Sequence, residues 1–99
     1  MNNKSIEKFP GNIGIAWYKP EQWELLRAES VDSENLEDTY GEWLEFVEQQ
    51  MQEARKAGII ISKVEVDVEE IIAWCRIRQR PMDTDARSEF VTQKMNEQT

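Results

Sequence analysis

The chain has 99 residues, a net charge of −8 and 39% apolar residues, a balance typical of a folded domain rather than a disordered chain. It has no histidine, which removes the commonest general base and metal ligand, and no apolar run near the roughly 20 residues that span a bilayer. We therefore expect residues 1–99 to form a single domain that is not an enzyme, holds no metal or cofactor and has no membrane partner.

The chain opens with a polar segment and a short apolar run. Residues 1–12 are polar and contain a Pro-Gly pair near their end, so we expect a flexible lead-in. Residues 13–18 are apolar on both faces, a pattern typical of a strand that is covered on both sides.

A first helix is predicted from Pro20 to about Ser30. Proline suits the first helical position because its missing N–H would have no partner there. This helix places Trp23 and Leu26 on one side, whereas Leu25 falls on the opposite side and is not explained by a single buried face.

A second helix has the strongest periodic pattern in the chain. We expect Asp32 or Ser33 to cap its first turn through a side-chain oxygen. Apolar residues then recur at spacings of three and four within roughly a 100° arc, which predicts a face toward the core. They are Leu36, Tyr40, Trp43, Leu44, Val47, Met51 and Ala54. Acidic residues occupy the rest of the surface, and Gly58 can supply the positive φ that ends the helix.

The second half of the chain repeats this order. Residues 59–66 form a β-branched run that predicts a strand, and Asp67 with Glu70 has the D-x-x-E spacing of a capping box. The helix that this pair opens should end near Gln79, because Pro81 disfavours a helical conformation at the residue before it.

A last helix is predicted after Pro81. Asp83 or Thr84 should cap it, and it should run to about Lys94. Residues 95–99 are polar, and we expect a frayed tail there.

The elements together predict an α+β fold. A two-stranded sheet would be covered by four helices in the order β-α-α-β-α-α, and the direction of strand pairing stays open. Because a two-stranded ribbon is marginally stable alone, strand addition across a dimer is one hypothesis.

Cys75 is the only cysteine, which excludes an internal disulfide and favours a reducing, cytoplasmic location. Cys75 shares a helix face with Val68 and Ile71, and the chain has no histidine to activate a thiol, so we expect a structural role. The sequence also has no phosphate-binding glycine loop, calcium loop or nucleophile elbow. We therefore name no catalytic residue.

The candidate partner-binding residues are Arg76, Ile77 and Arg80. On a helix that buries Val68 and its neighbours, both arginines point outward with Ile77 beside them. With Trp74 on the flank, this arrangement resembles a protein interface, where arginine and aromatic residues are enriched. The alternative is that the last helix or the tail covers Ile77.

Residues 68–94 also permit a second interpretation, as a helix-turn-helix. The segment is locally basic through Arg76, Arg78, Arg80, Arg87 and Lys94. Against a nucleic-acid partner stand the acidic chain and the positions of Asp85 and Glu89, near the start of the helix that would contact bases.

Arg87 differs from the other basic residues of this segment. It lies on the apolar side of the last helix, bracketed by Ala86 and Phe90. We expect it to lay its stem along the core and to pair with a carboxylate, with Asp83 one turn earlier within reach.

The pattern as a whole resembles a small family of uncharacterised bacterial proteins of about 100 residues. The matching residues are Trp17, Tyr18, Trp23, Tyr40, Glu42, Trp43, Val64, Glu65, Val66, Asp67, Ala73, Trp74, Cys75, Ala86, Arg87, Phe90 and Val91. The resemblance implies a stand-alone cytosolic domain and brings no activity, substrate or catalytic residue with it.

The leading prediction is a non-enzymatic protein–protein interaction module that self-associates as a homodimer or binds another protein. It would present the acidic helical surface and the patch of Arg76, Ile77 and Arg80. The alternative is a DNA-binding regulator that uses residues 68–94, and a third hypothesis is an acidic decoy for the nucleic-acid site of a basic enzyme. Whether the tryptophans leave a pocket for a small molecule stays open.

Overall fold

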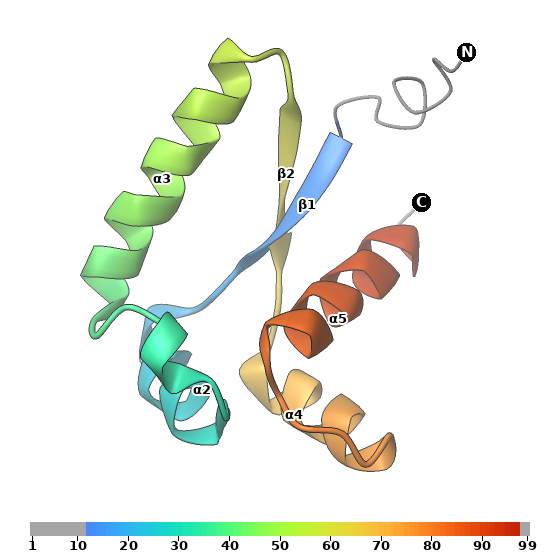
Figure 1. Ribbon diagram of the computed structural model, residues 1–99. Coiled ribbons are helices and arrows are strands. Elements are labelled where there is room, and N and C mark those ends of the chain that lie inside the picture. Colours follow the sequence, from blue (N-terminus) through green and yellow to red (C-terminus); the bar gives the residue numbers. More distant parts are fainter. Residues whose placement is uncertain (1–11, 98–99) are drawn as a thin grey trace.

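Two units of one strand followed by two helices form the chain, and the computed structural model describes residues 12–97 (Figure 1). The elements are β1 (Asn12–Trp17), the 3-10 turn η1 (Pro20–Gln22), α2 (Trp23–Glu29), the 3-10 turn η2 (Ser33–Asn35), α3 (Tyr40–Lys56), β2 (Ile60–Glu65), α4 (Val68–Ile77) and α5 (Thr84–Glu97). The predicted α+β fold and its element order are confirmed. The lead-in predicted at residues 1–12 lies outside the described residues, except that Asn12 begins β1.

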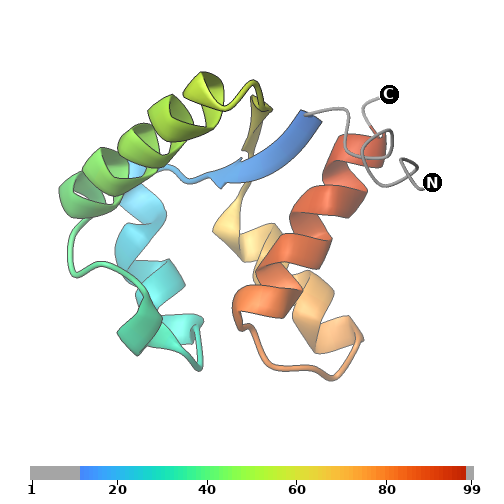
Figure 2. The ribbon, with the colours of Figure 1, turned by 45° about the horizontal axis from the view of Figure 1, so that its top comes forward.

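The two strands pair in parallel, which settles the strand direction. Ile13 lies opposite Ile61 and Trp17 opposite Glu65. Parallel strands need a long crossover, which α2 and α3 supply. Figure 2 shows β1 between α3 on one side and α5 on the other.

The two faces of the sheet are covered by different helices. On one face, Trp17 contacts Trp43 of α3, with ring centroids 5.2 Å apart. On the other face, α5 lies so close to β1 that a Cβ at Gly14 would overlap the sulfur of Met95. Gly14 therefore permits the close approach of α5, and this explains why a strand interior holds a glycine.

Most of the aromatic side chains fill the core. Trp23 is almost completely buried, and its ring centroid lies 5.5 Å from that of Trp43 and 5.9 Å from that of Tyr18. The hydroxyl of Tyr40 donates to the carbonyl of Tyr18, 3.0 Å away. Burial raises the pKa of Tyr18 to about 12.

Helix α3 begins later than the apolar stripe predicts. Thr39 is its N-cap, and the Thr39 hydroxyl accepts from the backbone N–H of Glu42. Ser33 begins the separate turn η2, and Leu36 follows that turn in an extended conformation. The predicted cap at Asp32 or Ser33 is therefore wrong, because the Asp32 carboxylate is bound elsewhere.

Arg87 holds that carboxylate, which corrects the predicted pairing with Asp83. The guanidinium binds both oxygens of Asp32, at 2.9 and 3.0 Å, and also donates to Ser30 and Thr84. Asp83 instead caps α5, since its carboxylate accepts from the N–H of Ala86. The prediction that Arg87 is buried and paired is confirmed, and the pair joins the segment after α2 to the start of α5.

Two further boundaries differ from the expected ones. Asp67 caps α4 as predicted, and its carboxylate accepts from the backbone N–H of Glu69. The predicted capping box does not form, because the carboxylate of Glu70 binds Lys94 instead. Helix α5 continues to Glu97, with Met95 partly buried against the core, so the expected fraying from residue 95 is too early. In residues 12–97, no helix is both long and apolar enough to cross a membrane.

Candidate interaction surface on α4

The orientation of α4 is fixed at its first turn by Gln22. Its side-chain amide donates to the Asp67 carboxylate and accepts from the N–H of Val68, each at 2.9 Å. The same hydrogen bond from Gln22 is the main reason that the pKa of Asp67 is lowered. Turn η1 is thus tied to the start of α4.

The buried face of α4 leaves an apolar strip outside. Val68, Ile71, Trp74 and Cys75 point into the core. Beside this buried face lies a strip in which Ile72 is half-buried and the other three residues, Ala73, Arg76 and Ile77, are exposed. Ile77 is 78% exposed, so neither α5 nor the described part of the tail covers it.

Two hollows flank this strip. One, of about 500 Å³, is lined by Leu25, Glu29, Glu69, Ile72, Ala73, Arg76 and Ile77. The other, of about 370 Å³, is lined by residues of α4 and α5 that include Trp74 and Phe90. Ala73 and Ile77 line both, so they form a ridge between two depressions, which we call the α4 ridge. A ridge with a hollow beside it is a shape that a second copy of the same surface can fit.

Leu25 belongs to this surface and was not identified as part of it from the sequence. It is half-buried on α2, packs against the core and lines the larger hollow with Ile72. Its position opposite the buried face of α2 was the available signal, because an apolar residue on that side needs a second contact.

The charges around the larger hollow have both signs. Arg76 lies 3.9 Å from the carboxylate of Glu29, and the side chains of the pair are 75% and 40% exposed. The carboxylate of Glu69 also lines the hollow. Such a loose, exposed pair is worth little on its own, so these charges are available to a partner.

The structure does not bring Arg80 to Arg76 and Ile77. Helix α4 ends at Ile77, and Gln79 adopts a left-handed conformation with φ of 54°. Arg80 then donates to Glu89 at 2.9 Å and lies over the ring of Trp74. This hydrogen bond to Glu89 raises the pKa of Arg80. Of the three predicted residues, Arg76 and Ile77 share one surface, and Arg80 lines neither hollow.

The basic residues of the segment 68–94 are largely matched by carboxylates. Arg80 pairs with Glu89 and Lys94 with Glu70, at 2.9 and 3.2 Å. Arg87 is buried in its pair with Asp32, and Arg78 stacks 4.2 Å above Trp74. This pairing leaves the segment with less positive charge for phosphates than its sequence indicates, which weighs against the helix-turn-helix interpretation.

Cys75 is buried, and burial raises the pKa of its thiol. A thiol of raised pKa is a poor nucleophile at neutral pH. The side chain packs in the core as a small apolar group.

Comparisons with protein-family models, with curated proteins and with solved structures gave no match for this chain.

Proposed function

We propose that this protein is a non-enzymatic interaction module that self-associates through the α4 ridge. The single observation that carries the proposal is the exposure of Ile77 on a ridge beside an apolar hollow. An isolated exposed apolar residue needs no explanation, but one that adjoins Leu25 and Ile72 forms a patch of the kind that marks interfaces.

A second copy of the chain is the partner that this patch fits best. In a two-fold symmetric interface the same patch meets itself, so each feature needs its complement within the patch. The α4 ridge offers an apolar projection and a hollow beside it, with Arg76 on one rim and the carboxylates of Glu29 and Glu69 on the others. Arg76 of one copy can then pair with a carboxylate of the other.

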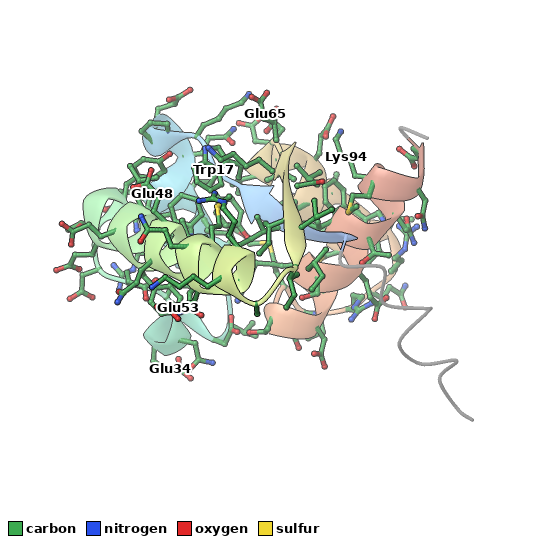
Figure 3. All side chains as sticks on the ribbon, turned by 90° about the horizontal axis from the view of Figure 1, so that it is seen from above. Trp17, Glu34, Glu48, Glu53, Glu65 and Lys94 are labelled. Atoms are coloured by element: carbon green, nitrogen blue, oxygen red, sulfur yellow. The ribbon has the colours of Figure 1, made fainter. Side chains whose placement is uncertain are left out.

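The acidic surface of α3 remains available in such a dimer. Figure 3 shows Glu48 and Glu53 on α3, across the sheet from Lys94 on α5. A dimer would thus carry two acidic faces, suited to basic partners. The lone buried thiol of Cys75 is consistent with a cytoplasmic location.

Sedimentation equilibrium over a wide concentration range tests the proposal. We expect the wild-type protein to dimerise, and Ile77→Asp to weaken the dimer by about tenfold or more, because it places a charge at the centre of an apolar contact. Arg76→Glu should also weaken it. Val31→Asp is the matched control, since Val31 is an exposed apolar residue away from the ridge.

A wild-type protein that is monomeric at every concentration would contradict the proposal. So would a dimer that Ile77→Asp and Val31→Asp affect equally.

A further inference from the structure

A separate groove runs along the free edge of β1. It has a volume of about 520 Å³, and its floor is formed by residues 13–16 of β1 and by Tyr18, which follows the strand. Phe46 and Trp43 of α3 form one wall, and Val91 with its neighbours on α5 forms the other. Figure 1 shows α3 and α5 on opposite sides of the two strands.

The backbone of β1 presents unpaired groups to this groove. Trp17 accepts from the N–H of Val66 at 3.3 Å, which shows that the groups of Trp17 face β2. In a parallel ladder, residues that face the neighbour alternate with residues that face away. Gly14 and Ala16 therefore turn their N–H and C=O groups into the groove. Such an edge is a template for a further strand.

The open edge has a defined end. Tyr18 continues the alternation of Gly14 and Ala16. Its carbonyl already accepts a hydrogen bond from the hydroxyl of Tyr40. Within residues 12–97, no side chain makes a hydrogen bond to the outward N–H or C=O groups of Gly14 or Ala16. These two residues offer two donors and two acceptors to an incoming strand.

The walls of the groove differ in chemistry. On the α3 side lie two exposed apolar side chains, Phe46 at 50% and Ile13 at 43%. On the α5 side lie three hydroxyls four residues apart, Thr84, Ser88 and Thr92. Because side chains alternate along a strand, the incoming segment would place apolar residues toward Phe46 and small polar residues toward the hydroxyls.

The charge of the groove favours a basic segment. Glu37 lines it, and the carbonyl of Glu37 is fixed by the indole N–H of Trp23 at 3.2 Å. The residues of α3 that line the groove, Trp43 and Phe46, carry no charge, and the cations of α3, Arg55 and Lys56, are confined to its last turn. Arg87 also lines the groove, but Asp32 neutralises it.

A second copy of the chain fits this groove less well. Antiparallel pairing of two β1 strands would place both α3 helices on the same face of the joint sheet. Two acidic helices would then approach one another in a protein whose net charge is already −8.

We infer that the β1 edge binds an extended segment of a partner protein, with alternating apolar and small residues and flanking lysine or arginine, as an added strand between α3 and α5. Recognition by strand addition takes its affinity from the main chain and its specificity from alternate side chains. This surface is distinct from the α4 ridge, so either can be correct without the other.

The test uses a synthetic peptide, KISVSIK, and its charge-reversed form, EISVSIE, titrated into the full chain and followed by NMR. We expect the basic peptide to shift and protect the amides of Gly14 and Ala16, and the acidic one to bind about tenfold more weakly or worse. Phe46→Asp should weaken binding of the basic peptide by about tenfold. Ile77→Asp, on the α4 ridge, should leave it unchanged.

Two further variants test the backbone and the charge. Ala16→Pro removes an N–H that faces the groove and leaves the ladder to β2 intact, so it should reduce peptide binding without unfolding the protein. Glu37→Lys should weaken binding more than Glu34→Lys, because Glu34 does not line the groove.

Four outcomes would overturn the inference. They are absence of binding by the basic peptide, equal binding of both peptides, shifts that spare Gly14 and Ala16, and binding that survives both Phe46→Asp and Ala16→Pro. Concentration-dependent protection of the Ala16 amide in the protein alone would also overturn it, since a second copy would then occupy the edge.

Discussion

Arg87 makes more polar contacts than any other side chain on the first turns of α5. Its guanidinium binds Asp32 through both oxygens and also reaches Ser30 and Thr84. Arginine suits this position because its planar fork matches a carboxylate. The pair crosses from one half of the chain to the other, so its effect on stability extends beyond the local turn.

Substitution of Arg87 should destabilise the fold strongly. Arg87→Ala leaves the carboxylate of Asp32 with little solvent and no cation, which typically costs about 3–5 kcal/mol of unfolding free energy. Urea denaturation measures the loss. Arg27→Ala, which breaks the exposed pair with Asp38, is the control and should cost less than about 1 kcal/mol. Similar losses for both variants would rule out the assigned role.

The same pair makes stability depend on acid. The hydrogen bonds from Arg87 are the main reason that the pKa of Asp32 lies well below its usual range. In the unfolded chain the pKa of an aspartate is about 3.9, so the unfolded state binds the proton first as the pH falls. The stabilisation by Asp32 is therefore complete above about pH 5 and is lost progressively as the pH drops below that value.

This acid sensitivity can be measured against Asp32→Asn. Between about pH 5 and pH 2 the free energy of unfolding should fall more steeply for the wild-type protein than for this variant. Parallel curves for the two proteins would show that Asp32 does not titrate differently on folding.

At the scale of elements, the sequence predicts which face of a helix is buried. It does not predict features that depend on contacts between residues far apart in the chain. The stripe on α3 is confirmed from Trp43 to Met51 because burial of that face sets its period. The stripe continues through Leu36 and so could not reveal where α3 begins. The T-x-x-E spacing of Thr39 and Glu42 was the available signal.

The candidate surface on α4 was likewise predicted only in part. Helical periodicity was enough to place Arg76 and Ile77 outside. It could not place Arg80, because the helix ends at Ile77 and Gln79 reverses the path of the chain. The partner of Arg87 was equally out of reach, since Asp32 is distant in sequence and had a plausible local role as a cap.

The corrected start of α3 leads to a prediction about its cap. Thr39→Ala should lower the free energy of unfolding by about 1 kcal/mol, because the N–H of Glu42 loses its acceptor. Ser33→Ala, at the originally expected cap, should change it by less than about 0.5 kcal/mol. Chemical denaturation of the two variants side by side decides between the two starts.

The contact between β1 and α5 leads to a second prediction at this scale. Gly14→Ala should cost about 1–3 kcal/mol, because the new methyl group meets Met95 and approaches Val64. The cost should fall in a Met95→Ala background, and a double-mutant cycle measures the difference. Additive losses would show that Met95 is not what excludes a side chain at Gly14.

At the scale of the molecule, one core joins both units. Trp23 and Trp43 from the first belong to the same cluster of buried side chains as Ile71 and Phe90 from the second. Because this cluster is shared, the two halves should not unfold independently.

We therefore expect a single cooperative transition. Unfolding followed by tryptophan fluorescence and by far-ultraviolet circular dichroism should give coincident curves. Fluorescence reports mainly the three clustered indoles of the first unit, whereas circular dichroism averages over all helices. An earlier transition by fluorescence would mean that the first unit opens alone.

The parallel pairing of β1 with β2 also affects how the chain reaches this state. All of α2 and α3 lies between the two strands, and Gly14 meets Met95 only after most of the described chain has been placed. Helices form locally within about a microsecond, whereas distant pairings must first close a long loop. Until they do, Ile13, Ile15 and Trp17 have no neighbours to cover them. The nascent chain thus carries an unpaired apolar strand through most of its folding time, a period in which it is open to chaperones and to aggregation.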